Sequence, residues 1–178
     1  MDYKNLLTEL LVAKQSAERQ GLSGMEFTKG LGALVPELLD RLQGRATSEE
    51  GRDALDHVLR RHEDDDFNDA NDYVERLDNS EKDAMVDSIL GQNRRDVEHQ
   101  AAEKSGLDES TIKKILLVIA PLVLISLSKN KKEKRFGRDD LPREVDELRG
   151  TVRGDGLFGQ VKNLLDKDGD GHILDDLF

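Results

Sequence analysis

The chain has 178 residues, is 36% hydrophobic and carries a formal net charge of −11. That length suits one domain of ordinary size, and the apolar content allows a modest core. The absence of cysteine excludes disulfides, thiolate zinc sites and cysteine nucleophiles, so a metal site would have to use oxygen atoms or the four histidines. The negative charge disfavours general affinity for nucleic acids, which depends on lysine and arginine.

Residues 1–51 are predicted to form an N-terminal helical segment packed on a core. The first 20 residues repeat apolar side chains at helical spacing, and Gly21 follows as a stop. This stretch lacks the basic start and the uniform apolar centre of a signal peptide, so we expect a cytoplasmic protein. A second apolar set spans residues 27–42, where Pro36 predicts a break near Val35.

Residues 52–128 are expected to form the helical core. Thr47 and Glu50 match the capping box of a third helix, whose apolar residues point inward. Residues 62–87 carry eleven acidic side chains, yet apolar residues still recur there at spacings of three and four. This pattern predicts a short acidic helix with a solvated face. Two further helices follow, one ending at Gly91 and one at Gly106.

The most apolar stretch of the chain, residues 107–127, predicts the helix around which the others pack. A helix that is apolar all round is a buried helix. Its unbroken apolar run ends at Ser126, short of the roughly 20 residues that a membrane span needs, so we predict a core helix and no transmembrane segment. Asp108 is placed to cap its start, and Pro121 is expected to kink the helix or divide it in two.

After the central helix the composition turns basic. Six lysine and arginine residues lie close together between Lys129 and Arg138, and glycines punctuate the chain from there to residue 156. Residues 129–156 are therefore predicted to be a basic flexible linker with one weak helix around residues 143–149. A final amphipathic helix opens the C-terminal segment, residues 157–178. Because no segment alternates apolar and polar residues as a strand does, the predicted class is all-α: one compact multi-helix bundle around the buried apolar helix.

The C-terminal helix runs directly into an aspartate-rich loop of the calcium-binding type. Alternating carboxylates occupy positions one, three and five of such a loop, and Gly171 provides the sharp turn at position six. Leu177 replaces the usual bidentate glutamate, so the loop is not a full EF-hand and we predict a weak, structural calcium site. An aspartate-capped turn without metal is the alternative. The predicted ligands are Asp166, Asp168, Asp170, the backbone carbonyl of His172, and one of Asp175 and Asp176.

Four pieces of sequence in a fixed order carry a resemblance to a known family. They are ILGQ, beginning at Ile89, then VEHQAAEKSGLDESTIKKILLVIAPLVL, a basic glycine-punctuated linker, and the terminal LLDKDGDGHILDDLF. In this combination, roughly over residues 52–178, the chain resembles the bacterial YidB-like family of unknown function. The resemblance implies an all-helical bacterial protein and brings no reaction, substrate or catalytic residue. The first two predicted helices lie outside it.

A helix-turn-helix spacing occurs just before the central stretch. Ala102, Gly106, Ile112 and Ile115 have the small, turn and apolar residues that lock two such helices together. The DNA-reading version needs an exposed second helix with polar side chains, whereas the second helix here soon becomes wholly apolar. The spacing therefore favours a packed helix hairpin over a DNA-binding motif.

The sequence contains no nucleophile elbow, phosphate-binding glycine loop or zinc signature. His57 and His62 are five residues apart, a spacing that does not place them on one helical face. We therefore predict a non-enzymatic helical binding or scaffold protein, with a protein partner as the candidate ligand and nucleic acid disfavoured. The alternative is a nucleic-acid-binding regulator that uses the helix hairpin and the basic linker.

Overall fold

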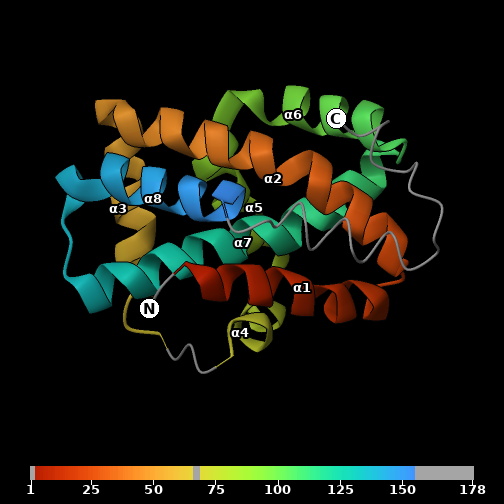
Figure 1. Cartoon of the computed structure of the whole chain (residues 1–178), viewed down its shortest axis with the longest axis horizontal. Coiled ribbons are helices and arrows are strands. Elements are labelled where there is room, and N and C mark those ends of the chain that lie inside the picture. The colour runs from red at the N-terminus through yellow and green to blue at the C-terminus, as the bar shows by residue number, and fades with distance from the viewer. Residues whose placement is uncertain (1–2, 66–68, 155–178) are drawn as a thin grey trace.

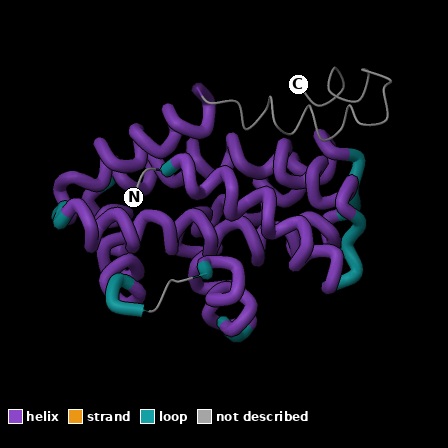
Figure 2. Tube along the Cα trace, turned by 60° about the horizontal axis from the view of Figure 1, so that its bottom comes forward, coloured by secondary structure: helices purple, strands orange, loops and turns teal. Residues whose placement is uncertain are grey.

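The computed structural model describes residues 3–65 and 69–154. These residues form eight α-helices, two short 3-10 helices and no β-strand, so the predicted all-α class is confirmed (Figure 1). Short connections join most successive helices (Figure 2). The α-helices are α1 (Lys4–Arg19), α2 (Gly24–Thr47), α3 (Glu49–His62), α4 (Ala70–Arg76), α5 (Asn79–Leu90), α6 (Arg94–Ser105), α7 (Glu109–Lys134) and α8 (Leu141–Gly154); the 3-10 helices are η1 (Gly91–Asn93) and η2 (Arg138–Asp140).

Helix α7 is the structural centre of the protein. In Figure 1 it crosses the middle of the molecule, with α1 on one side and α2 on the other. It packs against each of the helices α1 to α6, and every residue from Val118 to Ile125 is buried. Burying a large aliphatic side chain contributes about 1.5–3 kcal/mol, which explains why the other helices gather around this one. The predicted buried apolar helix is confirmed.

Among the described residues, α7 is also the one helix long and apolar enough to cross a membrane. Core helices of soluble proteins can have the same length and composition as a membrane-spanning helix. Most of the apolar stretch of α7 is buried inside the bundle, against other helices of the same chain. The burial of α7 is therefore consistent with the predicted core role.

Neither internal proline divides its helix. Pro36 lies inside α2 and Pro121 inside α7, and both helices continue past them, so the predicted break near Val35 is wrong. A proline inside a helix costs about 3 kcal/mol through a lost hydrogen bond and a clash with the preceding turn. Both helices bury apolar residues on each side of the proline, as Leu34 and Leu38 do around Pro36. The burial of these neighbours outweighs the local cost.

Side-chain caps fix where the helices begin. Asp108 accepts a hydrogen bond from the Thr111 amide at 2.7 Å, which confirms it as the cap of α7 and lowers the pKa of its carboxyl group. The cap of α3 is Ser48, which accepts from the Gly51 amide, so the predicted capping box at Thr47 is one residue too early. Thr47 instead ends α2, where its hydroxyl donates back to the carbonyls of that helix.

The segment predicted as a basic flexible linker is largely helical, which corrects that prediction. Residues 129–134 are the last turns of α7, and α8 occupies residues 141–154. Four buried apolar side chains at helical spacing pack α8 against α2, so the segment folds despite its basic composition. They are Leu141, Val145, Leu148 and Val152. Residues 155 and 156, and the final helix and loop predicted at 157–178, lie outside the described residues.

Most basic side chains of this segment have acidic partners on other elements. These ion pairs tie the end of α7 and the following turn to α3 and α8, so the positive charge is used in packing. The pairs join Lys131 with Asp56, Lys132 with Asp64, Lys134 with Glu144 and Glu147, and Arg138 with Asp53.

A buried glutamate joins the start of α1 to the end of α7. The Tyr3 hydroxyl donates to Glu144 of α8 at 3.0 Å, and the Lys134 ammonium donates to the same carboxylate at 3.1 Å. Lys134 supplies the opposite charge that a buried carboxylate requires. Burial, together with the nearby negative charge of Glu144, raises the pKa of Tyr3 above its usual range. These contacts fix the C-terminal turns of α7, where the basic residues lie.

Replacing Leu116 or Leu122 by alanine should destabilise the protein by about 2–5 kcal/mol, because both side chains are fully buried and truncation leaves a cavity. Urea unfolding followed by circular dichroism measures the change. Lys113→Ala, at an exposed position of the same helix, is the control and should alter stability by less than about 0.5 kcal/mol. Equally small effects at all three positions would show that α7 is not the core.

Candidate functional site

The predicted calcium ligands cannot be placed in the fold. All six of them lie outside the described residues, so the calcium site stays a prediction. In the part of the chain that the structure describes, no group of three or more histidine, aspartate or glutamate side chains is arranged to hold a metal ion. The ligands in question are Asp166, Asp168, Asp170, His172, Asp175 and Asp176.

The predicted helix-turn-helix spacing corresponds to the hairpin of α6 and α7. Gly106 makes the turn in the left-handed conformation, with φ 72°, and Ile112 and Ile115 are buried. The second helix of this hairpin is α7, which other helices cover along most of its length. In the first turns of α7, next to the hairpin turn, the exposed basic side chains are those of Lys113 and Lys114. The residues with the helix-turn-helix spacing therefore pack the α6–α7 hairpin into the core.

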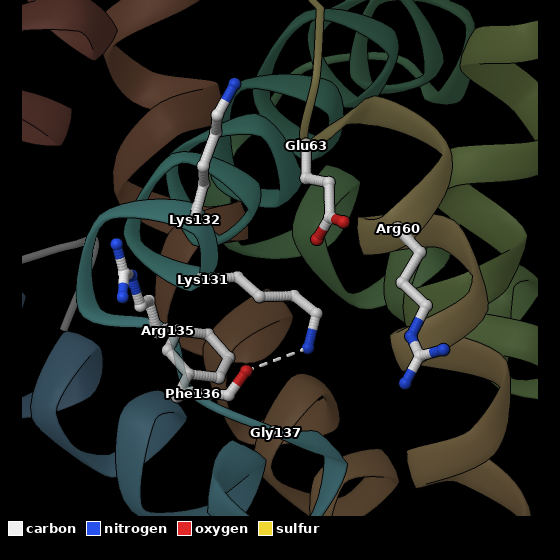
Figure 3. A pocket seen from close by; sticks show the side chains of 7 residues that line it. All are labelled: Arg60, Glu63, Lys131, Lys132, Arg135, Phe136 and Gly137. Atoms are coloured by element: carbon white, nitrogen blue, oxygen red, sulfur yellow. Dashed lines mark hydrogen bonds between the residues drawn. The ribbon is translucent and has the colours of Figure 1, made fainter.

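A pocket with a basic lining, called the basic pocket below, forms where α3 and α7 end. The buried Ser128 hydroxyl of α7 donates to the Leu59 carbonyl of α3 at 3.2 Å, which holds the last turns of the two helices together. The pocket opens to solvent and has a volume of about 410 Å³, within the ~300–1,000 Å³ typical of ligand sites. Its lining residues are Arg60, Glu63, Lys131, Lys132, Arg135, Phe136 and Gly137 (Figure 3).

Lys131 is the buried cation of the basic pocket. Its side chain is only 7% exposed, and its ammonium group lies 2.9 Å from one Asp56 oxygen and donates to the Phe136 carbonyl at 3.0 Å. The ammonium also lies 5.2 Å from the centre of the Phe136 ring. Arg60 contacts the other Asp56 oxygen through Nε at 2.8 Å. Asp56 therefore compensates part of the positive charge and holds the buried Lys131 in place, whereas the Arg60 side chain is 64% exposed.

Arg135 adopts a backbone conformation that usually belongs to glycine. It follows α7 with φ 56° and ψ 40°, and no other non-glycine residue in the described ranges has a positive φ. For a residue with a Cβ atom this left-handed conformation costs about 1–2 kcal/mol. The Arg135 side chain is exposed, lines the basic pocket and forms no ion pair with a described residue. Backbone strain at a pocket is a reason to suspect a functional role.

The charges in the basic pocket do not cancel. Four cationic side chains and one carboxylate, that of Glu63, line it. Lys132 pairs at 3.3 Å with Asp64 and points away from Lys131 in Figure 3. The C-terminal ends of α3 and α7 add partial negative charge, which the basic side chains also offset. An excess of positive charge remains on a protein whose net charge is −11, so this pocket can attract an anion.

A second polar cluster lies between α3 and α4. The His62 Nδ1 atom is 3.0 Å from Asp65 and 2.7 Å from the Tyr73 hydroxyl, which donates to Asp65. Burial and the hydrogen bond to Asp65 raise the pKa of Tyr73 above its usual range. Partial burial favours a higher pKa for Asp65, but hydrogen bonds from Tyr73 and His62 outweigh it and lower that pKa. The adjoining cavity has a volume of about 40 Å³, far below the ~300–1,000 Å³ typical of ligand sites, so we assign this cluster a structural role in joining α3 and α4.

Sequence patterns locate one half of the basic pocket. The basic cluster at residues 129–138 is evident, whereas no local pattern separates Arg60 and Glu63 from the other charged residues of α3. Only the packing of α3 on α7 brings the two halves together. The strain at Arg135 has a faint signal in the sequence, because the glycine expected directly after a helix comes two residues late, at Gly137.

A family model described as a bacterial protein of unknown function (DUF937) matches residues 6–130. The match covers most of α1 and all of α2, so the expectation that the first two helices lie outside the family resemblance is wrong. The terminal loop and the rest of the chain after residue 130 lie outside the match. No curated protein and no solved structure matches the chain. In agreement with the YidB-like resemblance, the chain belongs to the DUF937 family of bacterial proteins of unknown function.

Proposed function

We propose that the protein is a non-enzymatic helical binding protein and that the basic pocket is its binding site for an anionic ligand. The observation that carries this proposal is Arg135. Its guanidinium group has no carboxylate partner among the described residues, although its backbone stays in a strained conformation. A strained cation without a partner is expected where a ligand supplies the missing negative charge.

The fixed positions of the neighbouring cations support the same proposal. Asp56 holds the Lys131 ammonium and the Arg60 Nε atom before a ligand arrives. Binding to side chains that are already ordered loses less conformational entropy than binding to mobile ones. The partial burial of this cluster also weakens the screening of its charges by salt. The basic pocket is therefore preorganised for an anion at the buried Lys131 ammonium.

Arg135→Gly should stabilise the free protein by about 1 kcal/mol, because glycine adopts the left-handed conformation without a Cβ clash. The same change should weaken anion binding by at least about tenfold, since it removes the unpaired guanidinium group. Urea unfolding measures the stability. Titration with sodium phosphate, sodium sulfate and sodium citrate at constant ionic strength, followed by backbone amide chemical shifts, measures the binding.

Arg61→Gln is the matched control for this prediction. It removes one positive charge from an exposed position of α3 that does not line the basic pocket, so it should bind anions as the wild type does. Binding that is lost from a stabilised Arg135→Gly protein cannot be attributed to unfolding. If none of the three anions binds the wild type, or if Arg135→Gly binds them equally well, the basic pocket is not a binding site.

We also infer that the aspartate-rich terminal loop binds calcium weakly. The support comes from the sequence: Asp166, Asp168 and Asp170 alternate ahead of Gly171, in the positions that calcium loops use. Five aspartates within eleven residues repel one another, and a divalent cation relieves that repulsion. Because Leu177 stands where a bidentate glutamate is usual, the dissociation constant is expected at about 10⁻⁴ to 10⁻³ M.

Millimolar calcium should raise the melting temperature of the wild type and leave unchanged that of a variant carrying Asp168→Ala and Asp170→Ala. The reason is that a ligand which binds only the folded state stabilises it. Differential scanning calorimetry with and without calcium measures the shift, and magnesium at the same concentration controls for general salt effects. A calcium shift that is equal in both proteins, or absent from both, would favour the metal-free capped turn.

A further inference from the structure

We propose that the basic pocket selects inorganic phosphate over other oxyanions, because Glu63 accepts a hydrogen bond from the hydroxyl group that phosphate retains at neutral pH. This inference rests on the proposed function and names the ligand of the same site. Its basis is the placement of one carboxylate inside a pocket that four cationic side chains line (Figure 3). A pocket built for any anion at all would gain nothing from that carboxylate.

The basic pocket has enough unused donors for a tetrahedral oxyanion. Lys131 carries three N–H donors, and the Phe136 carbonyl accepts a hydrogen bond from one of them, while Asp56 lies 2.9 Å from the ammonium as its ion-pair partner. Arg60 contacts Asp56 through Nε, which leaves its two terminal nitrogens available to a ligand. Arg135 contributes a whole guanidinium fork, a geometry that binds phosphate oxygens in pairs. Figure 3 shows Arg60 on the side of Lys131 toward which its ammonium group points, and Arg135 on the opposite side, with its side chain extending away from that ammonium group.

Glu63 opposes an anion that has no proton to donate. It is half-buried, forms no ion pair with a described residue, and directs its carboxylate toward the space between Arg60 and Lys131 (Figure 3). An ionised carboxylate offers only acceptor oxygens, so it repels sulfate, which is fully deprotonated at neutral pH. Hydrogen phosphate can donate its hydroxyl to Glu63 while its other oxygens accept hydrogen bonds from the cations. One carboxylate thus disfavours sulfate and stabilises phosphate.

Phosphodiesters are rejected for the same reason. Each phosphate in a nucleic-acid backbone carries one negative charge and no hydroxyl group, so it has nothing to donate to Glu63. Binding of nucleic acid also requires many lysine and arginine contacts along the chain, whereas this site is a single pocket on an acidic protein. The basic pocket is therefore suited to a free phosphate ion and not to a nucleic-acid strand.

The test is a titration of wild type, Glu63→Gln and Arg135→Gly with sodium phosphate and with sodium sulfate, at neutral pH and constant ionic strength. Backbone amide shifts of residues 131–137 report occupancy of the pocket. Wild type should bind phosphate at least about tenfold more tightly than sulfate, the effect of one hydrogen bond to a charged group. In Glu63→Gln the two affinities should become similar, because the glutamine amide can donate to sulfate. Dimethyl phosphate, a diester, should not bind wild type.

The possible outcomes separate this inference from the proposed function. If wild type binds phosphate and sulfate equally, or if Glu63→Gln keeps the preference for phosphate, selection by Glu63 is wrong while the anion-binding pocket stands. If wild type binds neither of these ions nor citrate, the proposed function itself fails. Arg135→Gly should lose phosphate binding, and binding that it retained would place the ion elsewhere. Circular dichroism of each variant shows that the comparison is made between folded proteins.

Discussion

The burial of α7 is the constraint on which the rest of the structure depends. A helix that is apolar on all sides cannot face water, so six other helices cover it, and the cost of Pro121 is absorbed in that packing. The cover extends slightly beyond the apolar sequence, because Ser128, Asn130 and Lys131 are still buried. Beyond Leu127 the helix continues with polar residues, and its last turns carry Lys131 and Lys132 to the end of α3. The basic pocket thus lies where the apolar stretch of α7 stops.

The basic residues of this acidic protein are mostly used at junctions between helices. Lys131 and Arg60 share Asp56, and Lys134 shares Glu144 with Tyr3. Removing one partner of a buried pair typically costs about 3–5 kcal/mol, because it leaves an uncompensated charge in the interior. Such pairs add little stability compared with apolar packing, but they specify which helix ends meet. Arg135 differs, since no described carboxylate neutralises it and its backbone conformation opposes its presence.

Predictions from the sequence succeed where one residue pattern has one structural consequence. The apolar run of α7 favours a buried helix, and Asp108 directly before it favours a cap, and both predictions are confirmed. They fail where tertiary packing outweighs a local preference: Pro36 does not break α2, because the residues on both sides of it are buried. The basic residues 129–138 suggest a linker, whereas the apolar side chains of α8 and the acidic residues of α3 give that segment its order. No local pattern predicts the pocket, because two distant segments form it.

The family match ends inside the basic pocket, at residue 130. Arg60 and Glu63 lie inside the matched residues 6–130, and the remaining lining residues, from Lys131 to Gly137, lie beyond them. Asp56, which forms ion pairs with Lys131 and Arg60, also lies inside the match. The family match thus covers the residues of one wall of the pocket, and the segment after the match supplies the other wall. The buried pair of Asp56 and Lys131 spans this boundary, so any relative that shares the pocket must retain a cation on the last turn of α7. A relative that kept Asp56 without such a cation would leave this buried carboxylate with the more exposed Arg60 as its ion-pair partner, and removing one partner from a buried ion pair is costly.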